Sequence, residues 1–166
     1  MTTTRETGKL KISAEGDREI VMTREFKAPR RMIFEAWTKP ELLKRWLAGP
    51  EGWEMTVCTI DLKVGGSYRY EWHKAKTGET MGMGGEYREI VQDEKIVATE
   101  KFDMSWYPGG AIVTSVLAEK DGITTLTSTV TYDTREAREM VLRSPMETGV
   151  EASYARLDKL VETNFA

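Results

Sequence analysis

Two glutamates on neighbouring predicted strands are the side chains best suited to acid–base chemistry. Glu86 follows the glycines of MGMGGEY, and Glu100 alternates with Ala98 and Phe102. A carboxylate held among apolar neighbours has a raised pKa and can exchange a proton near neutral pH. The alternative for each is a glutamate that is solvated or paired with an arginine, such as Arg88 beside Glu86. Glu86 is thus a weak catalytic candidate and the first polar residue to test.

The single histidine and the single cysteine offer less chemistry. His73 alternates with Tyr70 and Trp72, so a surface histidine is a simpler interpretation than a general base in a cavity that those rings face. Cys58 alternates with Ile60 on a predicted strand. No histidine is placed to activate it, which favours a buried structural thiol over a nucleophile. One histidine and one cysteine give no metal-ligand spacing, and we predict no metal and no cofactor.

The glycine run Gly82, Gly84 and Gly85 resembles a phosphate-binding loop. Such a loop needs a helix N-terminus after it, whereas the following residues, EYREIV, have the pattern of a strand. The better interpretation is a bulge, or a close approach of the backbone to something bulky, either the C-terminal helix or a ligand.

Aromatic residues and methionines are the more useful signal, because they occur on most of the predicted elements. The chain has five tryptophans, six tyrosines and nine methionines. Core packing explains many of them, but such side chains also line the apolar pockets that bind small molecules. Together with Glu86, we predict a ligand-binding set of Trp37, Trp53, Tyr70, Trp72, Met83, Glu86, Phe102, Trp106, Tyr107, Met146, Val150 and Tyr154.

The segment 144–166 is the element around which these residues are arranged. Its apolar residues recur at spacings of three and four, which predicts one long helix with an apolar stripe. We expect Ser144 to cap this helix and Pro145 to be its first residue. The stripe consists of Met146, Val150, Ser153, Tyr154, Leu157, Leu160 and Val161. The opposite, solvent-facing side consists of Glu147, Glu151, Arg156, Asp158, Lys159 and Glu162.

The rest of the chain predicts mainly strands. Residues 1–8 are expected to form a disordered polar tail, and residues 9–166 a single domain. A strand at 18–26 precedes two short helices, at 30–37 and 40–47. Six strands follow, at 54–62, 67–74, 81–91, 95–102, 112–119 and 123–132, and then a short helix at 135–142. The hairpin turns and the one long helix indicate an α+β fold with a curved antiparallel sheet of about seven strands.

Composition limits the classes of function. The net charge is −3 and the basic residues are scattered, which argues against a nucleic-acid-binding protein. A single cysteine allows no internal disulfide and favours a reducing, cytoplasmic location. No signal peptide is recognisable, and no apolar run approaches about 18 residues, so we predict neither secretion nor membrane insertion.

Five segments, in this order, resemble the START-like (SRPBCC, helix-grip) superfamily and, within it, the branch named for the C-terminal domain of the activator of HSP-90 ATPase. They are APRRMIFEAWTKPELLKRWLAGP (28–50), IDLKVGGSYRYEW (60–72), GGEYREIV (84–91), EKIVATEKF (94–102) and SPMETGVEASYARLDKL (144–160). The resemblance implies a sheet that grips the C-terminal helix with an apolar cavity between them. In different branches that cavity binds lipids, sterols, polyketides or flavonoid-like molecules. The chaperone activators carry a further N-terminal domain that has no counterpart in this sequence.

Three functions follow from the residues and the resemblance, in order of preference. The first is binding of a small hydrophobic or aromatic molecule in the cavity. The second is a cyclase- or hydrolase-type enzyme that uses the same cavity, with non-enzymatic binding preferred. The third is a chaperone-interacting module like the HSP-90 ATPase activators. A homodimer formed through an exposed sheet edge is compatible with all three.

Overall fold

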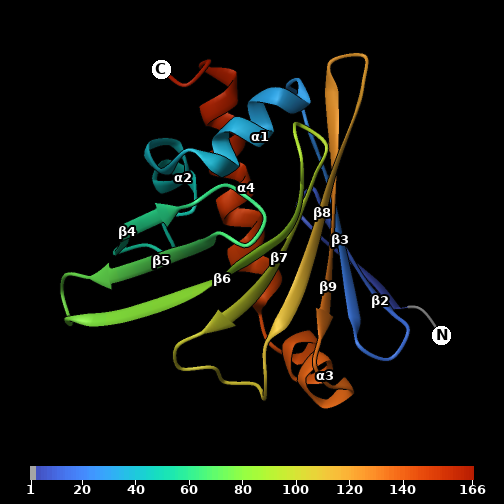
Figure 1. Ribbon diagram of the computed structural model, residues 1–166, viewed down its shortest axis with the longest axis vertical. Coiled ribbons are helices and arrows are strands. Elements are labelled where there is room, and N and C mark those ends of the chain that lie inside the picture. The colour runs from blue at the N-terminus through green and yellow to red at the C-terminus, as the bar shows by residue number, and fades with distance from the viewer. Residues whose placement is uncertain (1–2) are drawn as a thin grey trace.

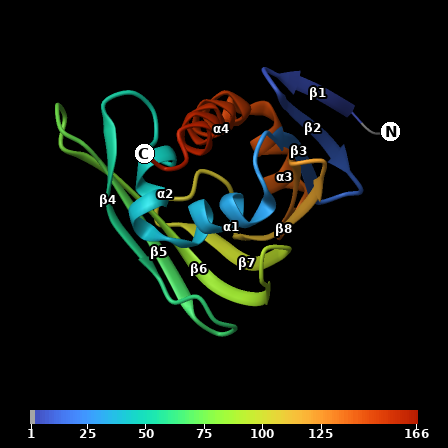
Figure 2. The same ribbon diagram turned by 90° about the horizontal axis from the view of Figure 1, so that it is seen from above.

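The computed structural model of the chain describes residues 3–166. Within them, nine antiparallel strands form one sheet in the order β1-β2-β3-β9-β8-β7-β6-β5-β4. Figure 1 shows the sheet with the last helix, α4, along its inner face. Seen from above, the sheet is an open trough that curves around α4, while α1 and α2 lie across one end (Figure 2). This is the predicted α+β helix-grip arrangement, with two short helices after the strand at 19–26.

The boundaries of the helices and of most strands lie close to those predicted from the sequence. The strands are β1 (Thr3–Thr7), β2 (Leu10–Glu15), β3 (Glu19–Phe26), β4 (Trp53–Ile60), β5 (Ser67–Lys74), β6 (Glu79–Val91), β7 (Lys95–Phe102), β8 (Ala111–Lys120) and β9 (Ile123–Tyr132). The helices are α1 (Arg30–Thr38), α2 (Pro40–Trp46), α3 (Arg135–Arg143) and α4 (Met146–Glu162). The described strands therefore number nine rather than about seven, and the two additional strands are both N-terminal.

The predicted disordered tail is wrong where the structure describes it. Residues 1 and 2 lie outside the described part, but Thr3–Thr7 form β1 and pair with β2. The sequence of β1 has no apolar alternation, because this edge strand is held by polar contacts. Arg5 forms an ion pair with Glu147 of α4 at 3.4 Å. In β2, by contrast, Leu10 and Ile12 are buried in the core.

The long helix begins slightly later than predicted. Pro145 precedes its first residue, Met146, and no side chain caps this helix. The hydroxyl of Ser144 instead donates to the carbonyl oxygen of Val141 at the end of α3, at 2.6 Å. Ser144 therefore closes α3 rather than opening α4.

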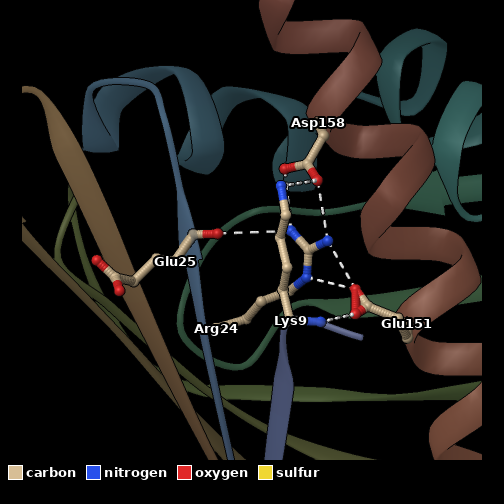
Figure 3. A network of polar contacts seen from close by, with 5 residues as sticks. All are labelled: Lys9, Arg24, Glu25, Glu151 and Asp158. Carbon is tan, nitrogen blue, oxygen red and sulfur yellow. Dashed lines mark hydrogen bonds and ion pairs between the residues drawn. The ribbon is translucent and has the colours of Figure 1, made fainter. Parts of the chain in front are cut away.

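A buried arginine fixes α4 to the sheet (Figure 3). Arg24 of β3 is only 3% exposed. Its Nε donates to Glu151 at 2.6 Å, and Nη1 and Nη2 each donate to one carboxylate oxygen of Asp158 at 2.9 Å. The backbone N–H of Lys9 also donates to Glu151 at 2.8 Å. The prediction that Glu151 and Asp158 lie on a solvent-facing side of the helix is therefore wrong, because both neutralise a buried cation.

Aromatic rings join α1, α2 and α4. The rings of Trp37 and Trp46 are 4.7 Å apart, and Trp46 lies 6.1 Å from Tyr154 of α4. The indole N–H of Trp46 donates to the carbonyl oxygen of Ala36 at 3.0 Å. This cluster packs the two short helices against α4 at one end of the trough.

Candidate functional site

A cavity of about 870 Å³ lies between the concave face of the sheet and α4. Strand alternation supplies its floor, since every second residue of a strand faces the same side. On β5 the inward residues are Tyr68, Tyr70 and Trp72, and on β7 they include Ala98 and Glu100. A largely apolar cavity of roughly 300–1,000 Å³ is typical of small-molecule sites.

Ten of the twelve residues predicted to bind a ligand line this cavity. They are Trp37, Tyr70, Trp72, Met83, Phe102, Trp106, Tyr107, Met146, Val150 and Tyr154. The two exceptions are Trp53 and Glu86. Trp53 is half-buried at the start of the edge strand β4 and packs beside Gly49.

Glu86 lies on the outer face of the sheet. Its side chain is 54% exposed, and its carboxylate is 3.7 Å from Nε of Arg88. The reason is the register of β6, in which Met83 and Tyr87 face inward and are buried, so the residue beside Tyr87 faces outward. Glu86 is thus the solvated, arginine-paired glutamate of the two alternatives, and it is not positioned to act on a ligand in the cavity.

Two glutamates line the cavity, and Glu100 is the one withdrawn from solvent, whereas Glu51 is exposed. Burial raises the pKa of Glu100 from 4.5 to about 7, because removing water disfavours the charged form. Its carboxylate forms no ion pair or hydrogen bond with another described side chain. At neutral pH a substantial fraction of Glu100 therefore carries a proton and can donate a hydrogen bond.

Tyrosines surround Glu100, and burial raises the pKa of each of them; that of Tyr107 rises to about 12. They consequently stay protonated at neutral pH. The hydroxyl of Tyr68 donates to the carbonyl oxygen of Thr99 at 2.7 Å. Those of Tyr107 and Tyr132, whose rings are 5.4 Å apart, form no hydrogen bond with another described residue. The polar groups of this region that a ligand can engage are thus neutral hydroxyls and a carboxyl group.

The glycine run makes room for the backbones of both neighbouring strands, β5 and β7. A Cβ on Gly85 would overlap the carbonyl oxygen of Thr99, and one on Gly84 would come within 2.7 Å of the carbonyl oxygen of Tyr68. The backbone N–H of Glu86 donates to the hydroxyl of Thr99 at 2.9 Å. The bulky neighbours predicted from the sequence are therefore the adjoining strands β5 and β7, and they are neither α4 nor a ligand.

His73 and Cys58 lie apart from the carboxylate. His73 is half-buried, on the opposite side of β5 from the inward rings. Cys58 is half-buried against the core, and burial raises its pKa to about 11, so the reactive thiolate is scarce at neutral pH. Among the described residues, no three histidine, cysteine or acidic side chains are grouped to hold a metal ion.

Arg156 is one of the cavity residues that the predicted ligand-binding set does not include. It was assigned to the solvent-facing side of the helix, yet it lines the cavity, and its Nη1 is buried without a hydrogen-bond partner in the described chain. The position of Arg156 in the sequence could have indicated that it faces the cavity. Gly149, Ser153 and Arg156 recur at three and four residues and therefore share one face of the helix.

The comparisons with known proteins agree with this architecture. The family model described as "Activator of Hsp90 ATPase homolog 1-like protein" matches residues 27–162. The chain belongs to this AHSA1-like family. Its START-like fold is therefore the one that the resemblance predicted. No curated protein sequence matches the chain, and no described helix combines the length and apolar character needed to cross a membrane.

Solved structures extend the match of this AHSA1-like chain. A protein from Rhodobacter sphaeroides is 30% identical with a TM-score of 0.88, covering 94% of this chain and 99% of that one. A protein from Chromobacterium violaceum is also 30% identical, with a TM-score of 0.72 over 87% of this chain and 97% of that one. An AHSA1-like protein from Aeromonas hydrophila, 17% identical with a TM-score of 0.68 over 87% and 93%, shares the fold.

Proposed function

We propose that this AHSA1-like protein binds a small, mainly apolar molecule in the cavity between the sheet and α4. The observation that carries the proposal is the cavity itself, about 870 Å³ and lined largely by aromatic and aliphatic side chains. A ligand that buries about 200 Å² of apolar surface there gains roughly 5 kcal/mol from the hydrophobic effect. That is enough to hold a drug-sized molecule once the polar groups of the wall orient it.

Glu100 supports a ligand with a hydrogen-bond acceptor on its apolar body. Its pKa of about 7 keeps part of the population protonated, and the hydroxyls of Tyr107 and Tyr132 are close enough for Glu100 to raise their pKa values. A neutral carboxyl group and two phenols can bind a carbonyl or hydroxyl oxygen without burying a charge. We therefore expect keto- or hydroxy-substituted apolar molecules to bind more tightly than plain hydrocarbons.

Tryptophan fluorescence tests the proposal directly. Four of the five tryptophans, Trp37, Trp46, Trp72 and Trp106, line the cavity, so a bound ligand should change the emission. Saturable quenching by some member of a panel of fatty acids, sterols, flavonoids and polyketide-like aromatics is expected. The absence of a saturable response to any of these compounds would contradict the proposal.

Replacing two alanines by leucine, one inside the cavity and one outside it, tests whether the ligand that changes the fluorescence binds in the cavity. Ala98 lies on the cavity floor and is buried, whereas Ala118 of β8 is exposed and does not line the cavity. Ala98→Leu places extra carbon atoms inside the cavity and should weaken binding, while Ala118→Leu should leave the affinity unchanged. Equal affinity in both variants would place the ligand elsewhere.

Catalysis is the second candidate, and Glu100 is the observation that favours it. A carboxyl group with a pKa near the working pH can serve as a general acid or base. Any turnover found with a ligand from the panel should be lost in Glu100→Gln and kept in Glu86→Gln. Equal turnover in the two variants would exclude Glu100 from the chemistry.

The family description points to a third candidate, activation of an Hsp90-type ATPase. This function does not require an open cavity, because a protein-binding module contacts its partner through its surface. If the chain stimulates such an ATPase equally well with Ala98 and with Leu at position 98, then the cavity is not part of that activity. The homodimer expected at a sheet edge would use β1 or β4, the outer strands of the described sheet.

A further inference from the structure

Three arginines of the described chain place guanidinium nitrogens in the interior, and they differ in how their charge is neutralised. Arg24 is 3% exposed and binds the carboxylates of Glu151 and Asp158. Arg138 is 4% exposed, forms an ion pair with Glu139 at 2.9 Å, and donates to two backbone carbonyls. Both therefore have protein partners, as buried charges require.

Arg156 is the exception: the residue is half-buried, and it is the arginine that lines the cavity. Its Nη1 is buried, and its guanidinium forms no hydrogen bond or ion pair with another described residue. A guanidinium cannot lose its proton in a protein, so this charge persists whether or not it has a partner. A buried donor without an acceptor is costly, and its presence at a cavity wall calls for an explanation.

No acidic side chain of the described chain is arranged to neutralise Arg156. The residues three and four positions away on α4 are Ala152, Ser153, Lys159 and Leu160. Glu100 lies in the same cavity, but burial alone accounts for its raised pKa, with no compensating effect of a nearby cation. The two groups are thus separate polar points on a mainly apolar wall.

From this we propose that the ligand of the cavity is an amphipathic anion, an apolar body with one oxyacid group that pairs with the guanidinium of Arg156. This inference rests on the proposed ligand-binding function and adds the chemical class of the ligand to it. The planar fork of arginine matches the two oxygens of a carboxylate and forms strong, charge-assisted bonds with it. The apolar body then occupies the aromatic part of the cavity.

Two fluorescent dyes that share one apolar skeleton test the proposal. Anilinonaphthalene sulfonate carries an acid group, and phenylnaphthylamine lacks it. Arg156→Gln should weaken binding of the sulfonate dye at least about tenfold, the effect of losing one hydrogen bond between charged groups. It should leave the affinity for the neutral dye within about twofold. Lys159→Gln, which removes an exposed cation from the same helix, should change neither affinity and so controls for loss of surface charge.

Each outcome decides between the proposals. If the neutral dye binds but Arg156→Gln leaves sulfonate binding unchanged, or weakens both dyes equally, the anion proposal is wrong and the cavity proposal stands. If neither dye binds the wild-type chain, the cavity proposal itself fails.

Displacement of the neutral dye provides a second measurement that uses carboxylate chemistry. Decanoate should displace it from the wild-type chain at lower concentration than decanol, and Arg156→Gln should abolish this preference. Should Arg156→Gln fail to fold, Arg156→Lys keeps the charge and should keep the preference for decanoate. Equal displacement by decanol and decanoate from the wild-type chain would overturn the proposal.

Discussion

The stability of the fold should depend on pH through Glu100. Its pKa is raised from 4.5 to about 7 in the folded chain, whereas in the unfolded chain it returns to its ordinary value. Between these two pH values the folded state holds a proton that the unfolded state has lost, so the free energy of unfolding falls as pH rises. Below the interval both states are protonated, and above it both are ionised, so the loss is complete above pH 7.

The size of this effect follows from the shift. A shift of this size corresponds to at most about 3 kcal/mol, and water that enters the cavity would reduce it. Glu100→Gln keeps the shape of the side chain but cannot ionise. Relative to wild type, the variant should therefore gain little stability near pH 4.5 and progressively more up to about pH 8, with the gain complete above the folded pKa.

Urea unfolding of both chains across this range measures the difference directly. Titrations common to both chains cancel in the subtraction, and the tyrosines that surround Glu100 have pKa values raised beyond the range used. Glu86→Gln is the matched control, since it makes the same substitution at an exposed position outside the cavity. A flat difference between Glu100→Gln and wild type would refute the assignment of a buried, ionisation-resistant carboxyl group.

Three further substitutions test the framework of the cavity. Arg24→Met should lower the free energy of unfolding by about 3–5 kcal/mol in urea, because it leaves the half-buried carboxylates of Glu151 and Asp158 without their partner; a loss below about 1 kcal/mol would contradict the role of this cluster. Gly85→Ala should destabilise by about 3 kcal/mol or more, since its Cβ overlaps a backbone carbonyl, and an unchanged urea midpoint would show that β6 can shift. Gly149→Ala should raise the melting temperature by about 2–4 °C, because a Cβ there meets nothing within 4 Å and a glycine within a helix costs about 0.5–1 kcal/mol relative to alanine. A lower melting temperature would contradict this.

The sequence predicts those helices and strands in which the buried side chains recur at a regular spacing along the chain. The alternation of Tyr68, Tyr70 and Trp72 on β5 and the stripe that includes Tyr154 and Leu157 on α4 match their buried faces in the structure. The first strand, β1, has no such regular spacing of apolar residues. Its residues are polar, and one contact that holds it joins Arg5 to Glu147, which is distant in the chain. A reading based on local pattern therefore treats it as a tail.

Charged residues that face the interior are the second feature that the sequence did not predict correctly. Arg24 falls between Met22 and Phe26 in the alternation of β3, an inward position, but its partners lie 127 and 134 residues away. No local pattern reveals them. The same holds on α4, where polarity alone assigned Glu151 and Asp158 to solvent although both face Arg24. Glu100 was recognised as a carboxylate among apolar neighbours, yet the sequence could not rank it above Glu86 without the register of β6.

Arg24, Glu100 and Arg156 differ in what makes a charged group tolerable at an inward position. The charge of Arg24 is neutralised by acids on α4, and the same guanidinium lies 5.8 Å from the ring centre of Tyr154, whose ring also lines the cavity. Glu100 reduces its charge by holding a proton. Arg156 has neither solution within the described chain. The Arg24 cluster thus uses its acidic partners to fix α4 against the sheet, whereas Arg156 lies at the cavity wall without a partner in the described chain, and there we propose that the acid group of a ligand binds it.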